Sequence, residues 1–292
     1  MIITKLIGGL GNQMFQYAAG RRTAIVNNTE LKLDITGYDN QVGITPRVYM
    51  LDIFHIHASI ATKQEIKLFN NRSKHIIQRN LHRIMLSLLR RHYIRQKTTG
   101  YFHEYLTIPD NSYLDGYWGS EKHFADIEDT IRKDFTLKNK PDAINRKIIS
   151  RIKNCDSVSL HIRRGDYVFN EKTNKYHGVC DQGYYLKAVD LLAKKVKKPY
   201  FFIFSDDIKW VKQNLILKYP CVYVDNNTGK QDHEDMRLMS ECKYNIIANS
   251  SFSWWGAWLN ENTNKIVIAP KKWFREPSIN TKDLIPQSWI KI

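Results

Sequence analysis

The sequence lacks the features that mark secreted and membrane-spanning proteins. Its four cysteines (Cys155, Cys180, Cys221 and Cys242) are widely spaced and form no Cys-x-x-Cys pair, so neither a disulfide scaffold nor a zinc site is indicated. No apolar run approaches the roughly 20 residues of a membrane span. The opening residues from Met1 to Ile7 are too short for a signal peptide and predict a first strand. We therefore expect a cytoplasmic protein.

Acidic residues are missing between Glu65 and Glu104, in a chain of 292 residues with a formal net charge of +16. Basic residues gather there: Arg72, Lys74, Arg79, Arg83, Arg90, Arg91, Arg95 and Lys97. Apolar residues recur between them at helical spacing, which predicts a basic amphipathic helix within residues 72–97. Such a helix either contacts an anionic membrane surface peripherally or packs on the core with a solvated basic face.

The excess of positive charge calls for an anionic partner. Nucleic acid, an anionic membrane and a small phosphorylated substrate are the candidates. The sequence has no RNP-like strand, zinc finger or Lys/Arg tail, so a nucleic-acid-binding protein is the least favoured interpretation.

Short apolar strands alternating with helical patterns predict an α/β protein with parallel sheets. The second half is the more regular, with strands expected at 158–162, 200–204, 222–224, 244–248 and 266–269. Two successive α/β series predict two Rossmann-like domains facing a cleft. We expect an N-terminal domain at 1–140, a C-terminal domain at 141–270, and a final segment, 271–292, that crosses back to the first domain.

The stretch from Ser157 to Tyr167 carries the most specific chemical signal. An apolar strand ends at His161, and Arg163 and Arg164 follow at its carboxyl end, where α/β folds place their ligand sites. Arginine is permanently charged and binds phosphate in a bidentate manner. The pattern favours a phosphorylated ligand, although a surface turn closed by an Arg–Asp ion pair also fits. His161 itself fits a buried core histidine, a general base or a ligand donor.

Three further strand ends carry polar residues. The segment Gly8-Gly-Leu-Gly-Asn-Gln13 either lets a ligand approach its backbone, at Gly11 among others, or is a plain tight turn. Asp206 and Asp207 follow another strand. There a carboxylate reads a guanine edge, or Ser205 or Asp206 caps the helix that begins near Ile208. Metal binding is a weaker alternative, because no Asp-x-Asp occurs.

In the segment from Asn249 to Leu259, Ser250 and Ser251 follow the asparagine, and three tryptophans come after them. Small hydroxyl residues at this position either cap a helix or contact a phosphate. Core packing is the better interpretation for most of the tryptophans.

Four motifs together resemble the bacterial α-1,2-fucosyltransferases of glycosyltransferase family 11. They are Gly8-Gly-Leu-Gly-Asn-Gln-Met-Phe-Gln-Tyr17, His161-Ile-Arg-Arg-Gly-Asp-Tyr167, Phe204-Ser-Asp-Asp207 and Asn249-Ser-Ser-Phe-Ser-Trp-Trp-Gly-Ala-Trp258. The resemblance covers nearly the whole chain. It implies a GT-B-like fold, in which 1–140 is the acceptor-side domain and 141–270 is the GDP-sugar-binding domain. It also implies inverting transfer of L-fucose from GDP-β-L-fucose to the 2-hydroxyl of a galactose-terminated glycan or lipid-linked saccharide, with no metal and no cofactor.

The resemblance also implies roles for individual residues. Arg163 would bind the β-phosphate with support from Arg164, and His161 with Asp206 or Asp207 would read the guanine. Ser250 or Ser251 would contact the diphosphate, while Asn12 would approach the reacting fucosyl oxygen. Glu171 is the suggested general base, with Asp166 and His161 as rivals. A transferase that uses another GDP-sugar is the alternative within enzymes.

Overall fold

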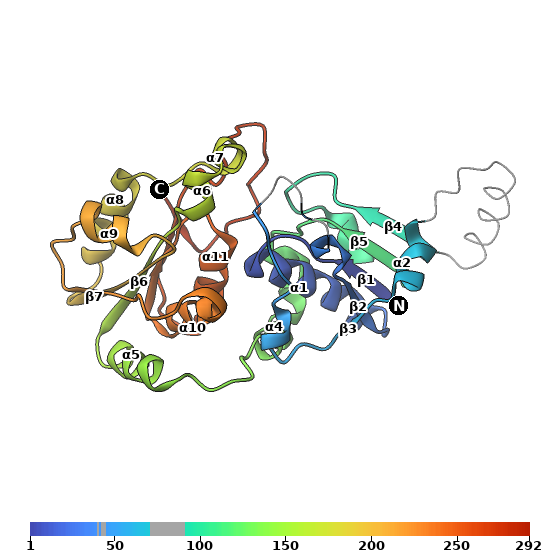
Figure 1. Ribbon diagram of the computed structural model, residues 1–292, viewed down its shortest axis with the longest axis horizontal. Helices are drawn as coiled ribbons and strands as arrows, with labels where there is room; N and C mark the ends of the chain where they lie inside the picture. The colour runs from blue at the N-terminus through green and yellow to red at the C-terminus, as the bar shows by residue number, and fades with distance from the viewer. Residues whose placement is uncertain (40, 42–44, 71–90) are drawn as a thin grey trace, which may run out of the picture. The chain divides into compact units, whose positions relative to one another are not determined.

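The computed structural model describes residues 1–39, 41, 45–70 and 91–292. Its described residues form two compact units (Figure 1). The first comprises Met1–Lys138 with Lys282–Leu284, and the second comprises Asn139–Thr281 with Ile285–Ile292. Each unit has its own parallel sheet, and this confirms the predicted α/β class with two Rossmann-like units.

The first unit is built on a five-stranded sheet in the order β3-β2-β1-β5-β4. Its strands are β1 (Ile2–Lys5), β2 (Leu31–Asp34), β3 (Ser59–Ile60), β4 (His92–Arg95) and β5 (Ser112–Asp115). Its α-helices are α1 (Leu10–Val26), α2 (Lys63–Asn70) and α4 (Glu128–Asp134). Short 3₁₀ turns lie at Thr36–Tyr38, Leu51–Ile53, His103–Thr107, Glu121–His123 and Ala125–Ile127.

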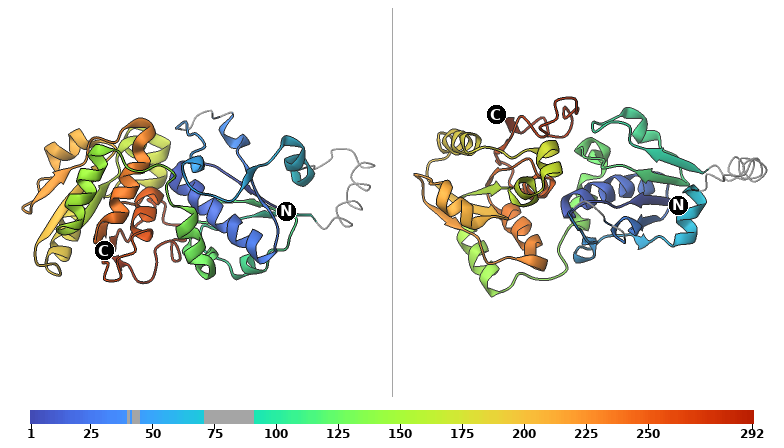
Figure 2. Two further views of the ribbon diagram at one scale, coloured as in Figure 1. Left: turned by 90° about the horizontal axis from the view of Figure 1, so that it is seen from below. Right: turned by 45° about the horizontal axis from the view of Figure 1, so that its top comes forward.

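Helix α1 fixes the geometry of this unit because it packs against β1 and β2 (Figure 2). Gly20 makes the close approach possible: a β-carbon at this position would lie 2.1 Å from Thr4 Oγ1.

The second unit is built on a six-stranded sheet in the order β11-β10-β9-β6-β7-β8. Its strands are β6 (Asp156–Ile162), β7 (Pro199–Ser205), β8 (Cys221–Tyr223), β9 (Tyr244–Ile246), β10 (Val267–Ala269) and β11 (Ile290–Lys291). Its helices are α5 (Ala143–Lys153), α6 (Gly165–Phe169), α7 (Glu171–His177), α8 (Gln182–Ala193), α9 (Ile208–Asn214), α10 (Asp232–Glu241) and α11 (Ser251–Trp258), and a 3₁₀ turn spans Gly229–Gln231.

Side chains from β6, β7 and α8 form the main core of the second unit. Val158, Leu160 and Ile203 pack there against Ala188 and Leu192, and all five are fully buried. Alternation along β6 turns Ser159 and His161 toward the other face of the sheet. Helices α10 and α11 cover that face (Figure 1).

Two sequence-based expectations need correction. The predicted basic helix at 72–97 falls largely on residues 71–90, which lie outside the described part, but His92–Arg95 form β4, an edge strand paired with β5. Alternating exposure along His92–Arg95 is the period of a strand. The sequence pattern of residues 120–132 also predicts one helix, but the structure has two 3₁₀ turns there before α4 begins at Glu128.

Candidate anion-binding site

The site in the second unit is created by the register of two central strands. Strands β6 and β7 are parallel, with His161 opposite Phe204 and Ile162 opposite Ser205. Because both strands end at the same edge, the loop that carries Arg163 and Arg164 lies beside the loop that carries Asp206 and Asp207.

Arg163 is held between two carboxylates. Its Nη2 donates to Asp166 Oδ1 at 2.5 Å, and its Nη1 lies 3.1 Å from Asp206 Oδ2. The guanidinium also lies over the Tyr167 ring, 5.2 Å from its centre. Burial alone would lower the pKa of Arg163, but the two carboxylates outweigh it, so the pKa is raised and the charge is secure.

The Nε–H of Arg163 is buried and has no hydrogen-bond partner in the described part of the chain. The guanidinium side chain is 19% exposed. An incoming phosphate oxygen would therefore meet a cation that is oriented, partly open to solvent and not fully satisfied.

Arg164 is directed differently from its neighbour. Its Nε donates to Asp207 Oδ2 at 3.1 Å, and its guanidinium lies 3.5 Å from the centre of the Trp210 ring on α9. Its backbone N–H donates to Asp206 Oδ1 at 2.8 Å. These contacts tie the loop after β6 to the loop after β7, so Arg164 braces the position of Arg163.

The two adjacent aspartates build this junction. Asp206 accepts from the Arg164 backbone through one oxygen and pairs with Arg163 through the other. Gly165 is required there, because a β-carbon on it would lie 2.2 Å from Asp206 Oδ2. Asp207 caps α9 by accepting from Trp210 N at 3.2 Å. The cap is therefore Asp207 rather than Ser205 or Asp206, because the helix begins one residue after Asp207 and only that position reaches its first N–H groups.

His161 is the buried neutral member of the site. Only 4% of it is exposed, and its ring lies 5.9 Å from Phe252. Burial, assisted by the charge of Arg163, lowers the pKa of His161 to about 3. Its Nδ1 has no hydrogen-bond partner among the described residues. A neutral imidazole with one unused nitrogen can bind a ligand, but it is a poor proton acceptor near neutral pH.

The candidate bases have different surroundings. Asp166 is engaged by Arg163. Glu171 is exposed at the first position of α7, a helix that Asn170 caps by accepting from Thr173 N at 3.0 Å. Asp166 is therefore paired with an arginine, whereas Glu171 is open to solvent.

Asn249, which sequence reasoning passed over, anchors the loops around the site. It is buried, and its Nδ2 lies within hydrogen-bond distance of the carbonyl oxygens of His177, Gly178 and Trp273 at 3.1, 3.2 and 3.1 Å. Its Oδ1 accepts from Cys180 Sγ at 3.5 Å. One amide therefore fixes the end of α7 and the segment after β10 to the start of α11.

The two serines that follow Asn249 lie at the start of α11. Ser250 occupies the N-cap position and is buried, but its side chain does not cap the helix. Ser251 is the first helical residue and is partly exposed. Trp254 and Trp255 are fully buried, which confirms the predicted core packing of these tryptophans.

The glycine-rich loop of the first unit is a tightly tied turn. Gly8 has a φ of +80°, which favours glycine. Gln13 donates to the carbonyl oxygens of Gly8 and Val48 at 3.1 and 2.8 Å and accepts from Met50 N at 2.9 Å. Gln13 therefore shapes the loop, whereas Asn12 is only partly buried at the start of α1 and Gly11 is buried.

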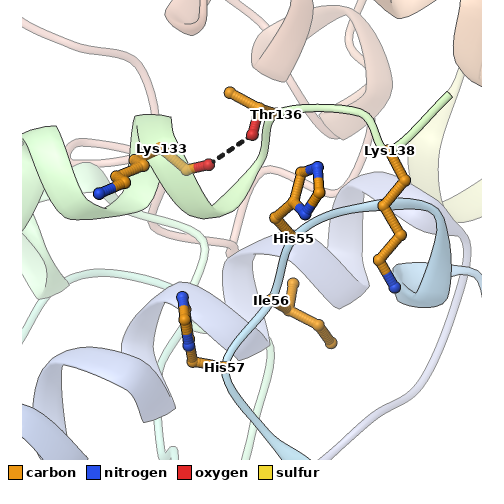
Figure 3. A pocket seen from close by; sticks show the side chains of 6 residues that line it. All are labelled: His55, Ile56, His57, Lys133, Thr136 and Lys138. Atoms are coloured by element: carbon orange, nitrogen blue, oxygen red, sulfur yellow. Dashed lines mark hydrogen bonds between the residues drawn. The ribbon is translucent and has the colours of Figure 1, made fainter. Parts of the chain in front are cut away.

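A separate cavity of about 430 Å³ lies in the first unit and contains none of the predicted site residues (Figure 3). His55, Ile56, His57, Lys133, Thr136 and Lys138 line it. Its polar groups are used locally: Thr136 Oγ1 donates to Lys133 O at 2.8 Å, and Lys138 Nζ donates to Asp52 O at 2.9 Å.

No group of three or more His, Cys, Asp or Glu residues in the described ranges is placed to hold a metal ion. No helix in these ranges is long and apolar enough to cross a membrane.

The fold and the site define a parallel α/β protein with a fixed arginine at the strand ends, which suits a phosphorylated ligand. The chain belongs to glycosyl transferase family 11, whose model matches residues 1–292, and this confirms the resemblance seen in the motifs. The protein is thus a glycosyltransferase.

Individual relatives are similar over different shares of the chain. The alpha-1,2-colitosyltransferase of Escherichia coli is 36% identical over 299 residues, covering 100% of this chain and 99% of the relative. The O-antigen biosynthesis glycosyltransferase WbnK of Escherichia coli is 34% identical, covering 98% and 99%. The galactoside alpha-(1,2)-fucosyltransferase 1 of Rattus norvegicus is 26% identical over 155 residues, covering 50% of this chain and 41% of the relative.

Among solved structures, the fucosyltransferase NodZ from Bradyrhizobium is similar with a TM-score of 0.46 and 13% sequence identity. The similarity covers 87% of this chain and 91% of that chain.

The depressed pKa of His161 predicts a pH dependence of stability. The pKa of His161 is about 3 in the folded protein and about 6.5 in the unfolded chain, so between these values the unfolded chain binds more protons. The free energy of unfolding is therefore at its full value above pH 6.5 and decreases as the pH is lowered toward 3. His161→Asn should flatten the slope of unfolding free energy across this window, measured by urea titrations at several pH values. The exposed, non-titrating position Asn264→Ala should keep the wild-type slope. An unchanged slope in His161→Asn would contradict a neutral buried imidazole.

The contacts of Asn249 predict a large cost for its replacement. Asn249→Ala leaves buried carbonyl groups without a donor and should lower the free energy of unfolding by about 1–3 kcal/mol. Asn249→Asp should cost more, because it places a carboxylate among carbonyl oxygens. Denaturant unfolding measures both, with the exposed Asn264→Ala as a control expected within about 0.5 kcal/mol of wild type. An Asp variant as stable as wild type would contradict this role.

Proposed function

We propose that the protein transfers L-fucose from GDP-β-L-fucose to the 2-hydroxyl of a galactoside in a glycan or a lipid-linked saccharide, with inversion at the anomeric carbon. Membership of family 11 and the 26% identity to a galactoside alpha-(1,2)-fucosyltransferase support this choice. The observation that carries it is Arg163, a charged and partly exposed guanidinium between Asp166 and Asp206.

In the proposed reaction the acceptor oxygen attacks the anomeric carbon opposite the diphosphate. The bond between that carbon and the β-phosphate oxygen breaks, and GDP leaves with the electron pair. Arg163 stabilises the negative charge that grows on the leaving diphosphate, and this contribution is largest in the transition state. Since the guanidinium is fixed in advance, the reaction needs neither a metal nor a cofactor.

The hydroxyl proton must pass to a base as the new bond forms. We assign this role to Glu171, because Asp166 is held by Arg163 and neutral His161 binds a proton too weakly. In this proposal His161 Nδ1 contacts the guanine, and Ser250 and Ser251 contact the diphosphate. Asp206 and Asp207 contribute by holding the arginine loop, and Asn12 approaches the sugar.

A second donor is supported by a specific comparison. The relative with 36% identity over the whole chain is named a colitosyltransferase. Colitose is fucose without its 3-hydroxyl, so one diphosphate site suits both GDP-sugars. The choice between them depends on a single hydroxyl and must be measured.

The test is GDP release from GDP-fucose and from GDP-colitose, with EDTA present and lactose as acceptor. Arg163→Ala should lower kcat/KM by about 100- to 1,000-fold, the typical effect of removing a fixed group that stabilises transition-state charge. Arg163→Lys should recover only part of this, because lysine cannot make a bidentate contact. Arg151→Ala is the matched control, since Arg151 lies over the Tyr200 ring away from the proposed site.

Two results would contradict the proposal. Loss of all wild-type activity in EDTA would contradict metal independence. Equal activities of Arg163→Ala and Arg151→Ala would remove Arg163 from the diphosphate site.

A further inference from the structure

The turn after β5 in the first unit is strained at a large aromatic residue. Trp118 has a φ of +54°, in the left-handed region that bulky side chains rarely adopt. Such a conformation is energetically unfavourable and persists only where the surroundings impose it.

Gln96 imposes this conformation. Its Oε1 accepts from Tyr117 N at 2.8 Å and from Trp118 N at 2.9 Å, and its own backbone N–H donates to Asp115 O at 2.9 Å. Gly116 makes room, because a β-carbon on it would lie 2.4 Å from Gln96 Cβ and 3.1 Å from Trp118 Cε2. The turn is thus held by the side chain of Gln96, the residue that follows β4.

The interior beneath the turn is not arranged for maximum stability. Trp118 is fully buried against His123, with ring centres 5.7 Å apart. Yet Trp118 Nε1, His123 Nε2 and Gln96 Nε2 are buried without hydrogen-bond partners in the described ranges. A strained residue together with three unsatisfied buried polar atoms is unfavourable for stability, and such features gather at functional sites. We therefore ask which side chain this turn exposes.

What the turn presents is Tyr117. While Trp118 points inward, Tyr117 is 49% exposed. Strand β5 pairs with β1, so Tyr117 emerges beside the loop that starts at Gly8. Tyr38 lies there too: its hydroxyl donates to Gly8 O at 3.1 Å, and Tyr117 is close enough to add to the rise in the pKa of Tyr38 that burial mainly causes.

We propose that Tyr117, held outward by Gln96 and the strained turn at Trp118, is a carbohydrate platform that stacks on the apolar face of the acceptor galactopyranoside. An aromatic face carries partial negative charge, and it complements the weakly positive C–H bonds on one face of a pyranose ring. The inference rests on the proposed function for the identity of the sugar.

The test combines binding and kinetics. Saturation-transfer NMR with methyl β-D-galactopyranoside reports the platform directly, calorimetry reports GDP binding, and lactose kinetics report KM for the acceptor. Tyr117→Ala should lose the galactoside signal and raise the acceptor KM by about tenfold, in line with the worth of an aromatic contact. GDP affinity should stay within about twofold of wild type. Tyr117→Phe, which keeps the ring, should bind the galactoside.

Matched variants at Gln96 test whether this side chain is needed to hold Tyr117 in its exposed position. Gln96→Ala should raise the acceptor KM as Tyr117→Ala does, whereas Gln96→Glu keeps the accepting oxygen and should stay near wild type. Tyr93→Ala is the control, because Tyr93 is 44% exposed on β4 of the same sheet; it should leave the galactoside signal in place.

The outcomes distinguish the platform from the proposed reaction. A wild-type protein without a galactoside signal, or a Tyr117→Ala protein with an unchanged one, would overturn the platform. If wild type transfers neither fucose nor colitose but binds the galactoside through Tyr117, the proposed function fails and the platform stands.

Discussion

The candidate anion-binding site depends on one electrostatic constraint: Arg163 must remain charged while it is largely buried at the end of β6. The constraint is met because the β6–β7 register brings Asp206 beside Arg163 and because Asp166 follows three residues later in the same loop. A buried guanidinium without such partners would cost several kcal/mol. Gly165, the cap by Asp207 and the brace formed by Arg164 on Trp210 all serve to keep these groups together.

The carboxylates of Asp166 and Asp206 also affect how an anionic ligand can bind Arg163. A diphosphate that contacts Arg163 competes with Asp166 and Asp206 for the same N–H donors, so the ion pairs must be exchanged in part for phosphate contacts. In the proposed reaction, release of GDP would restore the internal ion pairs, so Arg163 would stay oriented in the free enzyme without binding the product too tightly. The buried neutral His161 adds no charge to this balance, and Asn249 keeps the surrounding loops in place.

Much of this was predictable because strand ends carry strong signals. The apolar run before His161 and the run from Phe201 to Phe204 fixed two central strands, and parallel pairing brings their ends together. The β4 strand was missed because its alternation is only four residues long and follows a helical pattern. The role of Asn249 was not predictable, since its partners lie up to 72 residues away in sequence. The strain at Trp118 was hidden for a similar reason, because Gln96 precedes it by 22 residues.

The central claim is that the diphosphate of a GDP-sugar binds at Arg163. A crystal structure of the protein with GDP tests it most directly. We predict β-phosphate oxygens within hydrogen-bond distance of the Arg163 guanidinium, with at least one of its contacts to Asp166 and Asp206 lengthened to make room. Arg164 should keep its place on Trp210. A GDP molecule bound elsewhere, with both carboxylates still on Arg163, would contradict the account.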